Sequence, residues 1–520
     1  MIYIPFLLVL CFASTTFGRP NLYSTKVETS PEQQRADAVK EAYRFAWNGY
    51  HKFAFPNDEL LPLSNGFANS RNAWGASAVD GLSTAIVMEM PDIVNQILDF
   101  IPTINFDKTD TEVSLFETTI RYLGGLLSGK SRILVSLFEF EAYWSYPFLA
   151  YDLLSGPLSN LAPNRTAVDL ILKQATRLAD NLAFAFNTPT GIPVNDLFFT
   201  NQTTDQSTTN GIARIGTLVL EWTPQSYLLN PKPAVSEPWP GLVGSVLDVN
   251  TGEFVSTIGG WIGGSDSFYE YLIKMFAYDT SRFASYRDRW VLAADSTITH
   301  LASHPSSRPD FTFLAMFNGT SPIYASQHLA CFDGGNFILG GLILNEPKYI
   351  DFGLDLVNGC HETYVQTLTG IGPEIFRWVV DDKDDAANPQ PPANQTAFYA
   401  KAGFYIEESS YNLRPEVIES FYYAYRATRD QKYQDWAWNA FKAINATCRT
   451  GSGFAPLKDV NAPNGGGFED FQESFFFAEV LKYSYLIHAP EAEWQVEFDG
   501  ANPWVYNTEA HPFRIAGNPI

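Results

Sequence analysis

The sequence predicts an all-α protein built as a ring of helical hairpins in a single domain. Apolar residues recur at helical spacing along most of the chain, and the helical segments follow one another in pairs. No linker separates two halves of different composition, which favours one domain despite the 520 residues. Hydrophobic residues make up 46% of the chain and charged residues 18%, which is enough apolar surface for a large core.

The first predicted helix covers residues 30–55. Ser30 and Gln33 have the spacing of a capping box, and Pro31 suits the first helical position. Helical or nearly helical spacing then predicts further segments at 71–76, 78–90, 113–127, 141–154, 167–186, 267–278 and 286–300.

A predicted αα-hairpin follows in the last third of the chain. Pro415 lies near the start of its first helix, 415–429, and the link Arg429-Asp430 leads directly into the second, 431–446. The last predicted helix is 472–487. The acidic run 381–385 lacks the glycine and the spacing of a calcium loop, so we interpret it as a solvated loop.

Charge and processing signals restrict the possible partners and location. The net charge of -23 argues against nucleic acid as a partner, because phosphate binding needs clustered Lys and Arg. An apolar run within residues 1–18, too short to span a membrane, predicts a cleaved signal peptide and a secreted protein or one in the secretory-pathway lumen. Five N-glycosylation sequons in polar, loop-like surroundings agree: Asn164, Asn201, Asn318, Asn394 and Asn445.

Three cysteines remain after the predicted signal peptide: Cys331, Cys360 and Cys448. In an oxidising compartment one pair and one odd thiol are expected, and the spacing does not select the pair.

Several carboxylates stand in unusual surroundings. Glu117 and Arg121 share a stripe of an otherwise apolar helix, as a structural salt bridge or as groups facing an enclosed, wet space. Asp266 follows two glycines and fits either a helix N-cap or a site residue. Glu416 falls in a first helical turn, where the helix dipole favours its ionised form, and Glu419 follows one turn later.

The remaining candidates lie among aromatic residues. Phe475 and Glu479 occupy one face of the last helix, where a buried Glu needs a cation or a hydroxyl partner. His328 has no acidic or histidine neighbour at ligand spacing. The sequence has no HExxH, CxxC or P-loop motif and no GxSxG with catalytic partners. Carboxylates with aromatics point to glycoside hydrolysis.

Eight segments resemble the class I α-1,2-mannosidases of glycoside hydrolase family 47. In chain order they read RNAWGASAVD, LFETTIRYLGGLL, DSFYEYLIK, QHLACFDGG, TGIGPE, NLRPEVIES, ESFFFAEVLKY and VYNTEAHP. The resemblance implies an (α/α)7 barrel closed at one end by a C-terminal β-hairpin, a bound Ca²⁺, and inverting removal of α-1,2-linked mannose from high-mannose N-glycans. It implies a catalytic domain at 34–513, after a lead-in at 19–33 and before a tail at 514–520.

The resemblance also implies roles for individual residues. Glu117 matches the acid, Glu416 the base and Asp266 a third catalytic carboxylate whose share of the acid role stays open. Thr508 matches the Ca²⁺ ligand, and Cys331 and Cys360 match the family disulfide, which leaves Cys448 free. The mannose-binding subsite is matched by Arg121, His328, Arg414, Glu419, Phe475, Glu479 and Glu509.

Two features of this chain refine the expectation. Gly264, before Asp266, replaces the arginine of the endoplasmic-reticulum type, which resembles the less selective secreted fungal enzymes. We therefore expect several α-1,2-mannoses to be removed. Separately, we expect the enzyme to be a monomer. The segment 504–513, which by composition could be an exposed tail, is expected to lie at the floor of the barrel. The alternative function is a high-mannose glycan-binding protein of the same fold that does not cleave.

Overall fold

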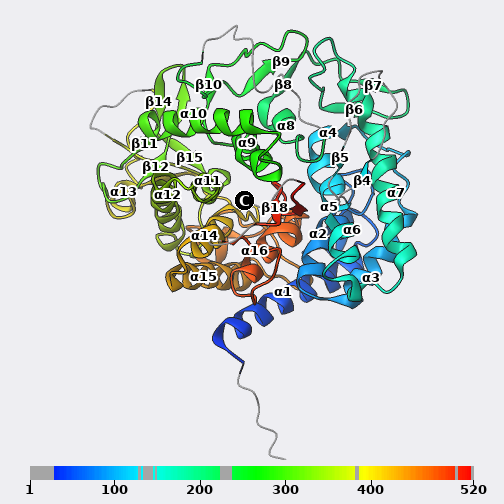
Figure 1. The fold of residues 1–520 in the computed structure, drawn as a ribbon. Helices are drawn as coiled ribbons and strands as arrows, with labels where there is room; N and C mark the ends of the chain where they lie inside the picture. Colours follow the sequence, from blue (N-terminus) through cyan, green and yellow to red (C-terminus); the bar gives the residue numbers. More distant parts are fainter. Residues whose placement is uncertain are drawn as a thin grey trace, which may run out of the picture.

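Helices surround the C-terminal segment of the chain in the computed structural model (Figure 1). The structure describes residues 29–126, 131–132, 145–146, 149–222, 237–380, 386–497 and 502–516. The chain runs around a ring, from α1 (Pro31–Phe53), in blue, to α16 (Leu481–Leu486), which packs beside α1. The predicted signal peptide and the acidic run 381–385 lie outside the described residues.

The first helix begins as predicted. The hydroxyl of Ser30 accepts a hydrogen bond of 3.1 Å from the backbone amide of Gln33, and Pro31 occupies the first turn. The helices α2 (Ala76–Val87) and α3 (Pro91–Phe100) follow and pack against each other. The segment 91–100 was not predicted as a separate helix.

The prediction of a helix at 71–76 was wrong. The carboxylate of Asp58 accepts hydrogen bonds from the backbone amides of Arg71, Ala73 and Ala76. Asn72 and Ala73 have φ angles of 67° and 58°, which an α-helix cannot contain. Three hydrogen bonds to one buried carboxylate therefore stabilise a turn here.

Three predicted helices are shorter or interrupted. The last, 472–487, consists of the π-helical turn η8 (Phe476–Val480) followed by α16. The segment 113–127 contains β3 (Val113–Ser114), α4 (Leu115–Thr118), a π-helical turn η2 (Thr119–Leu123) and α5 (Gly124–Leu126). In 141–154 the helix α6 (Leu149–Ser155) begins only after the strand β5 (Ser145–Tyr146). Residues 141–144 and 147–148 of this prediction lie outside the described residues.

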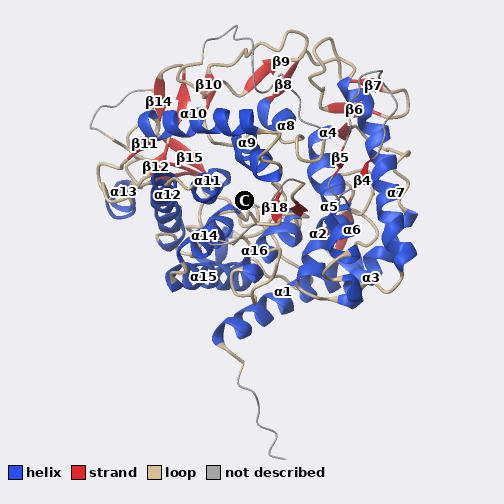
Figure 2. Cartoon of the chain, in the orientation of Figure 1, coloured by secondary structure: helices blue, strands red, loops and turns tan. Residues whose placement is uncertain are grey.

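The other helices complete the ring (Figure 2). They are η1 (Ile101–Thr103), η3 (Ser159–Leu161), α7 (Arg165–Leu182), η4 (Ala183–Phe186), α8 (Ile212–Gly216), α9 (Asp266–Tyr278), α10 (Ala284–His300), η6 (Leu329–Cys331), α11 (Phe332–Leu344), α12 (Pro347–Val365), α13 (Thr396–Ala402), α14 (Glu416–Thr428), α15 (Gln431–Thr447), η7 (Pro463–Gly466) and the π-helical turn η8 (Phe476–Val480).

The hairpin of α14 and α15 forms where it was predicted, whereas α11 was missed. That helix is buried over most of its length, so it has no polar face to reveal a period. It also contains four glycines that allow close packing: a Cβ atom at Gly340 would collide with the ring of Trp290.

The strands form small antiparallel sheets of two or three strands. They are β1 (Glu59–Leu61), β2 (Gly66–Ala68), β4 (Ser131–Arg132), β6 (Asp196–Phe198), β7 (Thr203–Thr204), β8 (Thr209–Gly211), β9 (Val246–Asp248), β10 (Ile258–Gly259), β11 (Ala302–Ser303), β12 (Phe313–Leu314), β13 (Met316–Asn318), β14 (Ser321–Ile323), β15 (Ala325–Gln327), β16 (Ile375–Arg377), β17 (Tyr405–Glu408), β18 (Trp504–Tyr506) and β19 (Pro512–Arg514).

The last two strands form a hairpin inside the ring of helices (Figure 1). Strand β18 pairs antiparallel with β19, in the register Trp504 to Arg514, and packs against α9. Between the strands, Asn507, Glu509 and His511 are buried. This segment is therefore part of the core and not an exposed tail.

A single cluster of buried apolar side chains extends from α1 to the end of β19, and a smaller one lies under β16 and β17. No helix in the described part of the chain is both long enough and apolar enough to span a bilayer. The core and the ring together hold the residues that face the centre of the molecule.

Candidate active site

A cavity of about 500 Å³ brings together polar residues from distant parts of the chain. Its walls come from α4, η2, α9, α14 and η8, and from the loop between β18 and β19. Ten of the predicted site residues line it: Glu117, Arg121, Asp266, Arg414, Glu416, Glu419, Phe475, Glu479, Thr508 and Glu509. His328 does not line the cavity and lies behind Glu416.

Glu117 is held by two arginines. Ser114, three residues before Glu117, caps α4: its hydroxyl accepts a hydrogen bond from the backbone amide of Glu117. The carboxylate pairs with Arg121 at 2.9 Å and with Arg71 at 3.0 Å. Burial alone would raise the pKa of Glu117, but the two guanidinium charges outweigh it and lower the pKa. Glu117 is therefore ionised in the free protein.

Arg121 joins one wall of the cavity to its floor. It is buried, and besides Glu117 it pairs with Asp80 at 3.3 Å and contacts the carboxylate of Glu509. The ring of Phe475 lies 5.5 Å from its guanidinium carbon, within the range of a cation–π contact. The stripe predicted from the sequence thus faces an enclosed polar space.

Asp266 is the first residue of α9, and the N-cap is Ser265, so the N-cap interpretation of Asp266 was wrong. The Asp266 carboxylate accepts a hydrogen bond of 2.8 Å from the backbone amide of Ser267. Burial, with the charges of Glu270 and Glu416, raises the pKa of Asp266 to about 7. A carboxyl in this state holds a proton over much of the neutral range.

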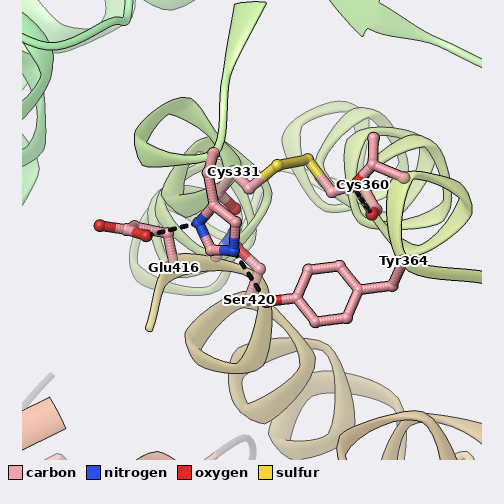
Figure 3. Close-up of a disulfide and its surroundings, with 8 residues drawn as sticks. Cys331, Cys360, Tyr364, Glu416 and Ser420 are labelled. Carbon is pink, nitrogen blue, oxygen red and sulfur yellow. Dashed lines mark hydrogen bonds and ion pairs between the residues drawn. A yellow bond between two sulfur atoms is a disulfide. The ribbon is translucent and has the colours of Figure 1, made fainter. Parts of the chain in front are cut away.

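Glu416 is the first residue of α14, and a histidine holds it from behind (Figure 3). His328 Nδ1 lies 2.8 Å from Glu416 Oε2, and His328 Nε2 lies 2.7 Å from the hydroxyl of Tyr364. Burial alone would raise the pKa of Glu416, but the hydrogen bond from His328 and the charge of Arg414 lower it. Glu416 is therefore ionised.

Arg414 adds a further charge beside Glu416. Its Nε donates a hydrogen bond of 2.6 Å to Glu374, which also accepts one from the backbone amide of Asn412. Glu374 follows the glycines of the TGIGPE segment and was not among the predicted site residues. It positions the arginine rather than lining the cavity.

Glu419, Glu479 and Glu509 crowd the floor of the cavity. Burial raises the pKa of Glu419 to about 8, against the charge of Lys274. Burial and the charge of Glu509 raise the pKa of Glu479 well above its ordinary range. Lys274 itself pairs with Glu270, and Glu270 lies one helical turn after Asp266 on α9. The floor therefore has more acidic groups than cations to balance them.

Thr508 lies in the loop of the C-terminal hairpin at this floor. The segment 504–513 was expected to be enclosed here, but Thr508 itself is half-buried and not fully buried. Its backbone amide donates to the hydroxyl of Tyr271. Within the described residues, neither its hydroxyl nor its carbonyl oxygen makes a hydrogen bond. Two free oxygens thus stand among buried carboxyl groups.

This donor set fits a hard cation such as Ca²⁺, which binds hydroxyl, carbonyl and water oxygens. Across the described ranges, no group of three or more His, Cys, Asp or Glu side chains is arranged to hold a metal ion. Thr508 would accordingly supply the protein ligands, and the neighbouring carboxyl groups would compensate the charge through water.

The disulfide expectation is confirmed. Cys331 and Cys360 form a bond with a Cα–Cα distance of 5.9 Å, and Cys448 is free and buried. The bond joins the end of η6, just before α11, to α12 (Figure 3), and Tyr364 on the same helix contacts His328.

The asparagines of the five sequons avoid the cavity. Asn164, Asn201, Asn318 and Asn394 are exposed. Asn445 was expected in a loop but lies in the last turns of α15, half-buried, because the helix continues through the sequon to Thr447.

Some residues of the site were missed. Arg71 belongs to one of the recognised segments but was given no role, although it pairs with Glu117. The unpredicted residues that line the cavity include Asn195, Asp196, Arg214 and Glu270. Only Glu270 had a usable signal, since it follows Asp266 by one helical turn. Tyr364 could not be linked to His328 from spacing alone.

Comparisons with known proteins agree with this geometry. The pattern of Glycosyl hydrolase family 47 matches residues 42–515. A mannosyl-oligosaccharide alpha-1,2-mannosidase of Penicillium citrinum is 53% identical, over 98% of both chains. One of Coccidioides posadasii is 56% identical, over 93% of this chain and 91% of that protein. The solved structure of an alpha-1,2-mannosidase from Trichoderma reesei has a TM-score of 0.87 and 50% identity, over 94% of this chain and 100% of that chain.

Proposed function

The chain belongs to glycosyl hydrolase family 47 and is an α-1,2-mannosidase, and we propose that it is a Ca²⁺-dependent, inverting exo-enzyme. Its substrates would be high-mannose N-glycans and the glycoproteins that carry them. The ring of helices would be the (α/α)7 barrel of the family, with the β18–β19 hairpin closing one end. The catalytic domain would cover residues 34–513.

One observation carries the mechanism: two carboxyl groups of the same cavity have opposite protonation preferences. Asp266 has a pKa raised to about 7, whereas the pKa of Glu416 is lowered. Hydrolysis of a glycosidic bond needs one group that gives a proton and another that accepts one.

Glu416 would act as the general base. Its ionised oxygen would take a proton from the water that attacks the anomeric carbon, while His328 and Arg414 hold the carboxylate in place. Attack from the face opposite the leaving oxygen inverts the anomeric configuration. In inverting enzymes the acid and base carboxyl groups are about 6.5–9.5 Å apart, which leaves room for this water.

Two residues compete for the acid role. The family resemblance favours Glu117, but two arginines keep it ionised in the free protein. Asp266 already holds a proton near neutral pH, so we propose that it protonates the leaving oxygen. Glu117 would then position Arg121 and the mannose beside it.

Ca²⁺, held by the two oxygens of Thr508, would bind and orient hydroxyl groups of the terminal mannose at the floor of the cavity. Arg121, Phe475, Glu479 and Glu509 would surround that sugar. A mannose enclosed this way must be a chain end, which fits exo-cleavage.

Gly264 supports broad trimming. It lines the cavity with φ 95°, and a Cβ atom at this position would meet no atom within 4 Å. The space beside Asp266 is therefore free for glycan branches of different shape, and we propose that several α-1,2-mannoses are removed.

The predicted signal peptide and sequons favour action outside the cytosol, in the secretory-pathway lumen or after secretion. We propose that the enzyme acts there as a monomer.

Incubation with a Man9 oligosaccharide, with and without EDTA, tests the proposal. Mass spectrometry should show stepwise loss of hexose in Ca²⁺, and EDTA should stop it. A Thr508→Ala variant should lose the response to added Ca²⁺. Tight binding of Man9 without any loss of hexose would favour the glycan-binding alternative. Cleavage that EDTA does not affect would contradict the role of Ca²⁺ only.

A further inference from the structure

We infer that Tyr364 is a positioning residue for the general base: its hydroxyl donates to His328 Nε2 and, together with the carboxylate of Glu416 on Nδ1, fixes the tautomer whose N–H faces Glu416. The consequence for catalysis rests on the proposed role of Glu416, whereas the tautomer itself does not. Tyr364 belongs to α12, is buried and does not line the cavity, so its action would be through His328 alone.

The hydrogen bonds determine where the protons lie. An ionised carboxylate can only accept, so His328 Nδ1 must carry the hydrogen that points to Glu416 Oε2 at 2.8 Å. In a neutral imidazole the other nitrogen, Nε2, then has a lone pair that needs a donor. The hydroxyl of Tyr364, 2.7 Å away, is in position to provide it.

The opposite tautomer would be costly. If Nε2 carried the hydrogen, the Nδ1 lone pair would face the carboxylate of Glu416 in a buried place, and both groups would lack a donor. Burial raises the pKa of Tyr364 well above its ordinary range, with the charge of Glu416 adding to the effect, so the phenol keeps the proton it donates.

Each residue of this chain of hydrogen bonds is anchored close to the disulfide (Figure 3). His328 precedes Cys331 by three residues, and Tyr364 follows Cys360 by one helical turn. On α14, Ser420 lies one turn after Glu416 and donates a hydrogen bond to the carbonyl of Cys331. The disulfide thus joins the segments that carry the histidine and the tyrosine, and the Ser420 hydrogen bond links the helix that carries the base to them.

Other charged groups also act on the base and must be kept constant in a test. Those that act on Glu416 or Tyr364 include Arg414, Glu374, Asp266, Glu419, Glu479, the thiol of Cys448 and the hydroxyl of Tyr411. The ring of Tyr411 lies 5.5 Å from that of His328, but its hydroxyl donates to the carbonyl of Arg414. Within the described residues, Tyr364 is the partner of Nε2.

The tautomer can be read without an activity assay. In protein with ¹⁵N-labelled histidine, the His328 signals, identified by their loss in His328→Gln, should show a protonated Nδ1 and an unprotonated Nε2 at pH 7. In Tyr364→Phe the Nδ1 proton still faces Glu416, but the Nε2 signal should move toward that of a protonated nitrogen, because the Nε2 lone pair has lost its donor. A wild-type His328 with its proton on Nε2, or an unchanged pattern in Tyr364→Phe, would overturn the inference.

Kinetics test the consequence for catalysis. Tyr364→Phe should lower kcat for α-1,2-mannobiose at least about tenfold and leave KM within about twofold, because the base and not the sugar contacts is disturbed. The matched control is Tyr349→Phe, which removes a buried tyrosine's hydrogen bond to Asp295 from the same helix and should leave kcat unchanged. Equal losses in both variants would indicate a general effect on α12 and contradict the positioning role. If the wild type proved inactive, the proposed function would fail while the NMR result still decided the tautomer.

Discussion

Asp266 and Glu416 occupy equivalent places in the fold and yet have opposite chemistry. Each is the first residue of a helix, α9 and α14, and each faces the same cavity. The pKa of Asp266 is raised to about 7, and that of Glu416 is lowered.

The difference teaches that neighbours, and not the helix start, set the protonation state. A helix N-terminus favours a carboxylate by roughly 0.3–1 kcal/mol, and this applies to both residues alike. Glu416 has His328 and Arg414 beside it, whereas Asp266 has the acids Glu270 and Glu416. The same local structure can therefore supply either an acid or a base.

Glu416→Gln should have the largest effect. It removes the proposed base, and we expect kcat for α-1,2-mannobiose to fall by about 10²–10⁴-fold at an unchanged melting temperature. Released mannose gives the rate, and calorimetry reports the fold. Glu493→Gln, at an exposed acid, is the control. A variant with more than a tenth of the wild-type rate would exclude Glu416 as the base.

Asp266→Asn should separate acid from base. We expect a loss of about 10²-fold on mannobiose but a much smaller loss on α-mannosyl fluoride, because fluoride leaves without being protonated. The variant Glu416→Gln should lose activity on both substrates. If Glu117→Gln instead kept its activity on the fluoride while Asp266→Asn lost it, the acid role would belong to Glu117.

The pH profile of kcat/KM should reflect the same pair. The acid must be protonated, so activity should fall about tenfold per unit as the pH rises beyond the Asp266 pKa of about 7. The base must be ionised, and because the pKa of Glu416 is lowered, the acid limb should lie below the ordinary range of a glutamate. Rates from pH 3 to 9 test this, and an alkaline limb below pH 5 would contradict it.

Glu270→Gln should give the smallest effect. Removing this negative charge lowers the pKa of Asp266, so the alkaline limb should move to lower pH by less than about one unit. The limb should not move in Glu493→Gln. A shift to higher pH would show that another group controls the limb.

The sequence revealed this site through motifs more than through periodicity. Glu117 with Arg121, and Phe475 with Glu479, were predicted from helical spacing, and both pairs line the cavity even though π-helical turns interrupt their helices. Predictions from α-helical spacing remain correct here for a physical reason. A π-helical turn adds one residue, which rotates a side chain around the helix axis but leaves it on the same wide cavity wall.

Contacts between distant segments could not be predicted. Tyr364 meets His328 across 36 residues, and Arg71 meets Glu117 across 46. The turn that places Arg71 depends on Asp58, whose hydrogen bonds to three backbone amides override the local helical pattern. The helix α11 was missed because burial on all sides leaves no periodic pattern.

The hairpin of β18 and β19 gives the molecule an order of assembly. The ribosome adds residues 504–514 after every helix that surrounds them in the described structure, and these residues bring Thr508 and Glu509 to the cavity. A nascent chain can therefore hold all of these helices and still have no site. We therefore expect activity to begin only when the last segment has entered the ring, because Thr508 and Glu509 line the cavity.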